Sequence, residues 1–181
     1  MSNYEILTND KSLKIDNLVK EKLIFFGERH VHAGDTNVIK KLITAVEPDY
    51  VLVEGLGDLI LQTKTNKIKA SKIDEDDLFY GGLTKWWIDV ALEFEDTPFI
   101  GFELTDQDDL KNASLAEKFE AREDHWIKII KKYATNNSYV LVVCGDTHLR
   151  TISTKELGGS SPLYKSFPNA VFIRCPEPEI E

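Results

Sequence analysis

Apolar residues in this chain occur in short unbroken runs that alternate with longer stretches of helical period. The runs are rich in β-branched and aromatic side chains and are bounded by Gly, Pro or Asn, which predicts buried strands. Strands that lack polar alternation and are separated by helices are typical of a parallel sheet covered on both faces. The predicted strands occupy residues 23–27, 50–53, 98–102, 139–144 and 171–174.

Helices are predicted between these strands. Good N-cap residues precede apolar residues that recur every three or four positions, and Pro48 ends the first such stretch. Ser114 and Glu117 have capping-box spacing and begin the longest helix. A short piece at 15–19 is expected to pack at the edge of the sheet. The other predicted helices cover residues 36–46, 86–94 and 163–167.

The composition suits a single α/β domain over residues 1–181, with a mostly parallel central sheet flanked by helices. A chain of 181 residues with 42% hydrophobic residues can bury roughly 70% of its unfolded surface. The net charge of −9 and the lack of a basic cluster argue against nucleic-acid binding. No apolar run approaches the ~20 residues of a membrane span, and residues 1–22 lack a signal-peptide pattern. We therefore expect a cytoplasmic protein that does not bind membranes.

Two further features leave alternatives open. Cys144 and Cys175 lack metal-finger spacing and are expected to be buried free thiols, although the spacing also permits a disulfide. The charged segment 62–77 is too polar for a core, so it is either a solvated helix or a mobile cover.

Carboxylates follow four of the predicted strands. Glu28, Glu54, Glu103 and Asp146 each come within a residue or two of a strand end. Because parallel strands point the same way, these side chains should leave the sheet at its carboxyl edge, where α/β folds bind ligands. Glu28 and Glu54 would face each other if their strands are adjacent.

Histidine and arginine side chains are also expected near the carboxyl edge of the sheet. Of four histidines, His30 and His32 follow the first strand and His148 follows the fourth, so His30 and His148 are candidates for chemistry. His32 and His125 are expected to support the site or bind substrate, as are Glu103 and Asp146. Arg122 lies in the apolar stripe of the longest helix and needs an anionic partner, because an unpaired buried charge is costly.

In its motifs the chain resembles the TraB/Tiki superfamily and its relatives, the erythromycin esterases and the ChaN-like iron-regulated proteins. Gly27-Glu28-Arg29-His30, followed by a helix, Pro48-Asp49, a strand and Glu54, is similar to the opening block of that family. Arg122 resembles the helix-borne arginine of its middle block. Gly145-Asp146-Thr147-His148-Leu149 is similar to its closing block, although Asp146 stands where the family often has a small apolar residue.

The resemblance implies a hydrolase that activates water with a His/Glu cluster and cleaves an amide or ester in a small molecule or peptide. Glu28, His30, Glu54, Arg122 and His148 are the predicted catalytic residues, with Arg122 stabilising negative charge in the transition state. In one version His30, His148, Glu28 and Glu54 hold a divalent ion, for which Mn, Zn, Co or Fe would suit the ligands. In another version no metal is bound, and His30 acts as the base.

Two alternatives from other classes remain. The chain could be a binding module that takes haem, as ChaN-like relatives do, or a small anion through Arg122. It could also be an interaction protein that keeps these residues only as a structural network.

Overall fold

The computed structural model describes residues 5–7, 15–29, 33–57, 60–61, 82–104, 110–151, 157 and 159–174. A sheet of seven strands runs through these residues in the order β1-β7-β2-β6-β3-β5-β4. The inner five strands are parallel, and the two edge strands, β1 and β4, are antiparallel to their neighbours. The strands are β1 Glu5–Leu7, β2 Leu23–Glu28, β3 Tyr50–Val53, β4 Ile60–Leu61, β5 Phe99–Gly101, β6 Val140–Gly145 and β7 Val171–Arg174.

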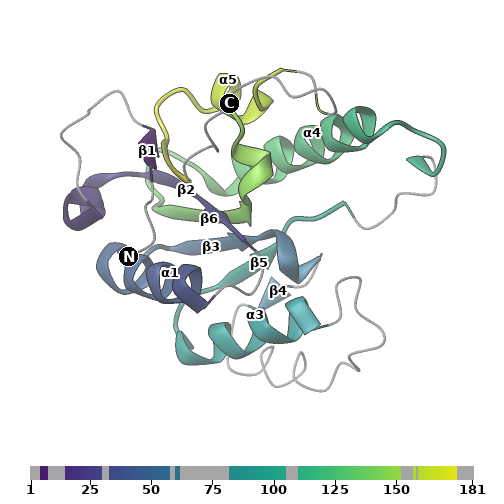
Figure 1. The fold of residues 1–181 in the computed structure, drawn as a ribbon. Coiled ribbons are helices and arrows are strands. Elements are labelled where there is room, and N and C mark those ends of the chain that lie inside the picture. Colours follow the sequence, from purple (N-terminus) through teal and green to yellow (C-terminus); the bar gives the residue numbers. More distant parts are fainter. Residues whose placement is uncertain are drawn as a thin grey trace.

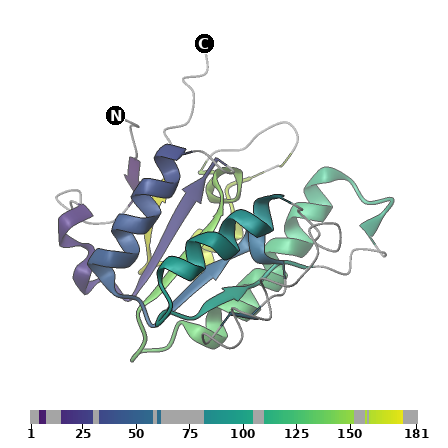
Figure 2. The same ribbon diagram turned by 90° about the horizontal axis from the view of Figure 1, so that it is seen from below.

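Helices cover both faces of the sheet. Figure 1 shows α1 (Ala33–Val46) and α3 (Gly82–Glu93) on one side of the strands, and α4 (Leu115–Tyr133) and α5 (Pro162–Ser166) on the other. Figure 2 shows α1 and α3 in front of the sheet, running roughly along the strands. The predicted α/β architecture with a mostly parallel sheet is confirmed.

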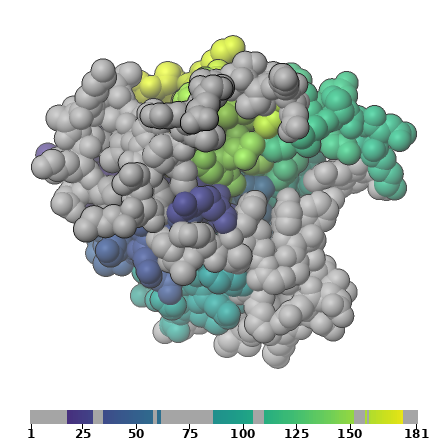
Figure 3. Space-filling view, viewed as in Figure 1, coloured from purple at the N-terminus to yellow at the C-terminus, as the bar shows by residue number. Residues whose placement is uncertain are grey.

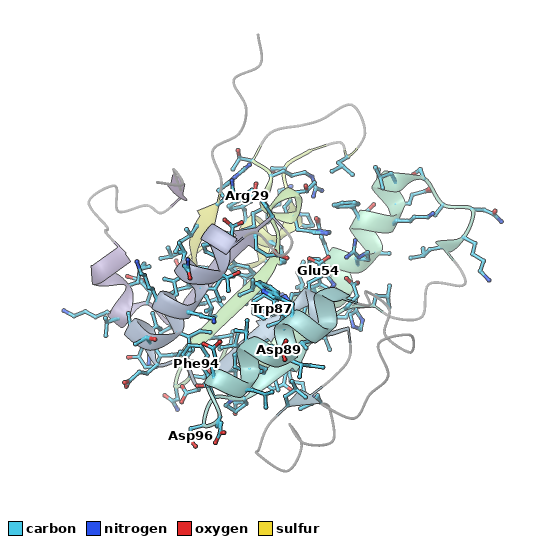
Figure 4. The ribbon with its side chains drawn as sticks, turned by 60° about the horizontal axis from the view of Figure 1, so that its bottom comes forward. Arg29, Glu54, Trp87, Asp89, Phe94 and Asp96 are labelled. Atoms are coloured by element: carbon cyan, nitrogen blue, oxygen red, sulfur yellow. The ribbon has the colours of Figure 1, made fainter. Side chains whose placement is uncertain are left out.

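Each face of the sheet has its own apolar core. Along β2, Phe26 packs in the cluster under α1 and α3, whereas Phe25 packs under α4 and α5. Trp87 of α3 is fully buried and turns toward the strands, while Asp89 is exposed (Figure 4). Alternate residues of one strand therefore serve two cores, which explains why the strand sequences show no polar alternation.

Three details differ from the sequence predictions. β2 and β3 are not adjacent, because β6 lies between them and pairs with both. Glu28 and Glu54 were expected to face each other only if β2 and β3 were adjacent, and this condition is not met. The short edge strands β1 and β4 were not predicted. The piece expected at the sheet edge is a 3-10 turn, η1 (Ile15–Lys20), which packs beside α1.

Some predictions fall on residues that lie outside the described part of the chain. These are His30, His32, Cys175 and the charged segment 62–77. Within the described ranges, no helix is both long and apolar enough to cross a membrane.

Candidate functional site

Charged side chains follow all five parallel strands at one edge of the sheet. Glu28 ends β2, Arg174 ends β7, and Glu103 lies two residues after β5. Glu54 begins the 3-10 turn η2 (Glu54–Leu56) after β3, and Asp146 begins η5 (Asp146–Leu149) after β6. All are buried except Asp146, whose side chain is 20% exposed. The prediction that these carboxylates reach the same edge is confirmed.

Arg122 of α4 joins two of these carboxylates. Its Nη2 donates to Glu54 Oε1 at 2.5 Å and also to Glu103 Oε2, while its Nε donates to Glu103 Oε1 at 2.9 Å. η2 packs beside α3, and Figure 4 shows Glu54 near this helix. Arg122 reaches Glu54 from α4. The predicted pairing of Arg122 with strand-end carboxylates is confirmed.

Backbone and indole donors hold the same two carboxylates. Glu54 Oε2 accepts from the backbone N–H of Gly145 at 2.7 Å, which ties the end of β3 to the end of β6. Glu103 Oε1 accepts from the backbone N–H of Leu104 at 2.7 Å and from Trp126 Nε1 at 3.4 Å. Donors on several sides fix the orientation of each carboxylate.

His148 lies between two of the acids. Its Nδ1 is 3.0 Å from Glu123 Oε1, and its Nε2 is 3.8 Å from Glu54 Oε1. An ionised carboxylate can only accept, so the contact with Glu123 assigns a proton to Nδ1 and leaves Nε2 facing Glu54. The buried ring stacks on Phe119 with centroids 4.4 Å apart and packs against Trp126 at 4.2 Å.

Glu123 and Arg150 also belong to this cluster, and neither was among the predicted site residues. Glu123 is fully buried, and Arg150 Nη1 donates to its Oε1 at 2.6 Å. Arg150 Nε also donates to the Gly159 carbonyl at 3.1 Å. A signal for Glu123 was present, because it lies four residues after Phe119 and three before Trp126 on the apolar face of the helix.

A second polar group surrounds the end of β7. Arg174 Nη2 lies 3.6 Å from Asp146 Oδ2, and its Nη1 donates to the Leu149 carbonyl at 3.0 Å. The Tyr164 hydroxyl donates to the same carbonyl at 2.6 Å. Burial raises the pKa of Tyr164 above its ordinary value, so this hydroxyl stays protonated at neutral pH. Gly27 faces this group, since a Cβ there would lie 2.4 Å from Asp146 Oδ1.

The remaining predicted site residues are placed less centrally. Glu28 pairs in register with Gly145, two strands away from Glu54. His125 is half-buried on α4, one turn after Arg122. Arg29 and Asp35 flank the stretch that carries His30 and His32, and Arg29 donates to Asp35 through both its backbone N–H and its guanidinium.

The described residues do not form a metal site by themselves. No three His, Cys, Asp or Glu side chains among them are grouped as metal ligands. Of the predicted ligand set, Glu54 already accepts from Arg122 and Gly145, and His30 lies outside the described part.

Comparison with known proteins supports the fold. No family model and no curated protein matches the sequence. RRSP, a MARTX toxin effector domain from Vibrio vulnificus, aligns with a TM-score of 0.60 at 11% identity, over 92% of this chain and 38% of that one. A structure described as bacterial protein toxins aligns with a TM-score of 0.58 at 12% identity, over 93% of this chain and 39% of that one.

A haem-binding ChaN structure from Campylobacter jejuni also aligns, with a TM-score of 0.42 and 13% identity, over 90% of this chain and 91% of that one. This chain spans under two fifths of the length of the toxin chains that it matches. At such identities, the likeness to the toxin structures shows a shared fold.

Proposed function

We propose that the chain is a hydrolase of the TraB/Tiki and erythromycin-esterase type, in which His148 activates water to cleave an ester or amide. One observation carries the proposal, namely the placement of His148 between Glu123 at 3.0 Å and Glu54 at 3.8 Å. A histidine that a carboxylate holds at one ring nitrogen is the usual arrangement of a general base, and in His148 the other nitrogen, Nε2, faces Glu54. His148 thus takes the role that the resemblance suggested for His30.

In the reaction, His148 Nε2 removes a proton from water as the water oxygen attacks the substrate carbonyl. The imidazolium that forms is stabilised by Glu123 at Nδ1 and by the charge of Glu54 near Nε2. It then returns the proton to the leaving alcohol or amine. Phe119 and Trp126 fix the ring plane, so Nε2 keeps its direction through both transfers.

The role that we propose for Arg122 differs from the predicted one. Two carboxylates neutralise its guanidinium, so it is poorly suited to stabilise further negative charge on the substrate. We assign it to holding Glu54 and Glu103 in place. Loss of Arg122 would leave two buried carboxylates without their main partner, which is costly.

A metal-free mechanism fits the donor set best. Glu54 already accepts from the Arg122 guanidinium and the Gly145 N–H, so a metal ion bound there would have to share its oxygens with both donors. The haem-binding alternative has a direct test, since a Soret shift on adding haemin that is lost on substitution of His148 would support it.

The hydrolase is tested with a panel of p-nitrophenyl esters and fluorogenic peptides. We expect His148→Gln to lower kcat/KM by at least about 100-fold and Glu123→Gln to lower kcat. Asp124→Asn is the matched control, because Asp124 is the exposed neighbour of Glu123 on α4. Thermal melting of each variant confirms that the fold persists. Turnover that is equal in wild type and His148→Gln, or that is absent over the whole panel, would contradict the proposal.

A further inference from the structure

A hollow of about 420 Å³ lies between the edge of the sheet and α4, next to the strand-end cluster. β5 and the residues after it form its floor, and Ile60 of β4 and one face of α4 form its walls. On α4 the lining residues are His125, Ile129, Lys132 and Tyr133. These positions are three or four apart in sequence, or adjacent, and so share one side of the helix. The first turns of α4 stand out at one side of the molecule (Figure 3).

The floor and walls are mainly apolar. Phe102 is buried and is held edge-on against Trp126, with ring centroids 5.0 Å apart. Ile129 is half-buried, and Ile60 exposes 47% of its surface. The volume lies in the range of small-molecule sites, which is about 300 to 1,000 Å³. An apolar chain or ring would therefore find a fitting surface here.

The hollow has a different polar group at each end. Glu103 lies at one end, where it is held by Arg122, so this end adjoins the cluster around His148. Lys132 lies at the other end and is exposed. Ten residues of helix separate Arg122 from Lys132, which is about 15 Å along the axis. In a chain of net charge −9, a lysine at the far end of an apolar hollow favours an anionic group there.

We propose that this hollow binds an acyl or arylalkyl group that ends in a carboxylate. The apolar part lies against Phe102 and Ile129, and the carboxylate pairs with Lys132. This inference rests on the proposed function, because it makes the hollow the subsite for one side of the hydrolysed substrate. His125, which was predicted either to support the site or to bind substrate, is part of the wall of this subsite.

The binding experiment uses the full chain and 4-phenylbutyrate as the probe, with affinity measured by calorimetry or ligand-observed NMR. 4-Phenylbutylamine and 4-phenylbutanol have the same apolar part with a cationic or a neutral end. We expect the carboxylate to bind at least about fivefold more tightly than either, which corresponds to one exposed ion pair. Equal affinities for the three compounds, or no binding at millimolar concentration, would overturn the proposal.

Two variants locate the probe. Lys132→Glu should lose the preference for the carboxylate, whereas Lys128→Glu should keep it, because Lys128 is exposed on the same helix and does not line the hollow. Ile129→Trp should fill the hollow and weaken all three compounds. Identical effects of the two lysine variants would assign the preference to net charge and reject the subsite.

The subsite and the hydrolase can fail separately. If phenylbutyrate binds with the predicted Lys132 dependence in a protein that turns over no substrate, the subsite stands and the hydrolase falls. If turnover depends on His148 but no probe binds, the hydrolase stands and the subsite falls. Where wild type binds the probe, His148→Gln should bind it equally well, because His148 does not line the hollow.

Discussion

Cys144 should make the protein less stable as the pH rises into the alkaline range. Its thiol is buried near the end of β6, and burial, followed by the nearby charges of Glu54 and Glu123, raises its pKa well above the ordinary value. The folded thiol therefore keeps its proton while the unfolded thiol ionises near pH ~8.5. Above that pH the unfolded state binds fewer protons, so the free energy of unfolding falls by up to about 1.4 kcal/mol per pH unit.

Urea unfolding between about pH 7 and about pH 9.5 measures this slope. Replacement of Cys144 by Ala should flatten it, whatever the variant costs at neutral pH. Ellman's reagent gives a second measure, because native Cys144 should react only as fast as the chain opens. A wild-type slope retained in Cys144→Ala would show that other groups cause it.

Arg150 keeps Glu123 in place inside the protein. Glu123 is fully buried, so Arg150→Met would leave it with a neutral neighbour and the His148 ring as its remaining partner. Breaking a buried ion pair by removing one partner costs about 3 to 5 kcal/mol, which is the loss expected here. Lys128→Met, at an exposed position of α4, should change stability by less than about 0.5 kcal/mol. Denaturant titration compares the two.

The capping box at the start of α4 was predicted from sequence and is present. Ser114 Oγ accepts from the Glu117 backbone N–H at 3.3 Å, and the Glu117 carboxylate accepts from the Ser114 N–H at 2.7 Å. These bonds to Ser114 lower the pKa of Glu117. Ser114→Ala should cost about 1 kcal/mol of stability and return the Glu117 pKa toward about 4.3 in an NMR titration. Asn112→Ala, in the exposed stretch before the cap, should change neither quantity.

Local sequence signals predicted the helices and strands well, but they did not predict the order of the strands in the sheet. Apolar runs located all five parallel strands, and the stripe of α4 correctly required partners for Arg122. The placement of β6 between β2 and β3 has no local signal, because strand order depends on which surfaces pack best in the whole chain. Glu123 differs from β6 in this respect, because its position on the apolar face of α4 was a local signal for a buried acid.

Gly101 permits close contact between β5 and η2. A Cβ at this position would lie 2.4 Å from the Gly57 carbonyl oxygen, which also accepts from the Glu103 N–H at 2.9 Å. The atoms nearest to such a Cβ all belong to the backbone of Leu56 and Gly57, so no flexible side chain could move aside. Gly101→Ala should therefore separate β5 from η2, cost about 1 to 3 kcal/mol, and reduce any activity that depends on Glu54 and Glu103.

Gly159→Ala is the matched control for this substitution. A Cβ at Gly159 meets nothing within 4 Å, so the variant should keep stability within about 0.5 kcal/mol of wild type. Chemical denaturation and His148-dependent turnover, measured on both variants, test the prediction. Equal effects would indicate that glycine flexibility, and not the contact at Gly101, sets the cost.

In the sheet, an early strand of the chain pairs with the two last ones. β2 lies between β6 and β7, so both of its neighbours come from residues 140–174. β3 also pairs with β6, and Asp49, just before β3, accepts from the Tyr139 N–H at 2.8 Å. Pairings between strands so distant in sequence form late and carry a large entropic cost of loop closure.

A fragment of residues 1–134 should therefore lack stable tertiary structure, although it contains β2, β3, β5 and, of the α-helices that the structure describes, α1, α3 and α4. Without β6, the strands β2 and β3 have no common neighbour, and the core under α4 loses Val140, Val142 and Cys144. We expect weak near-UV circular dichroism and no cooperative thermal transition from this fragment. Addition of a peptide of residues 135–181, which supplies β6 and β7, should restore both signals in proportion to complex formation. Cooperative melting of the fragment alone would mean that β3 and β5 form a core with α1 and α3 before the C-terminal strands join.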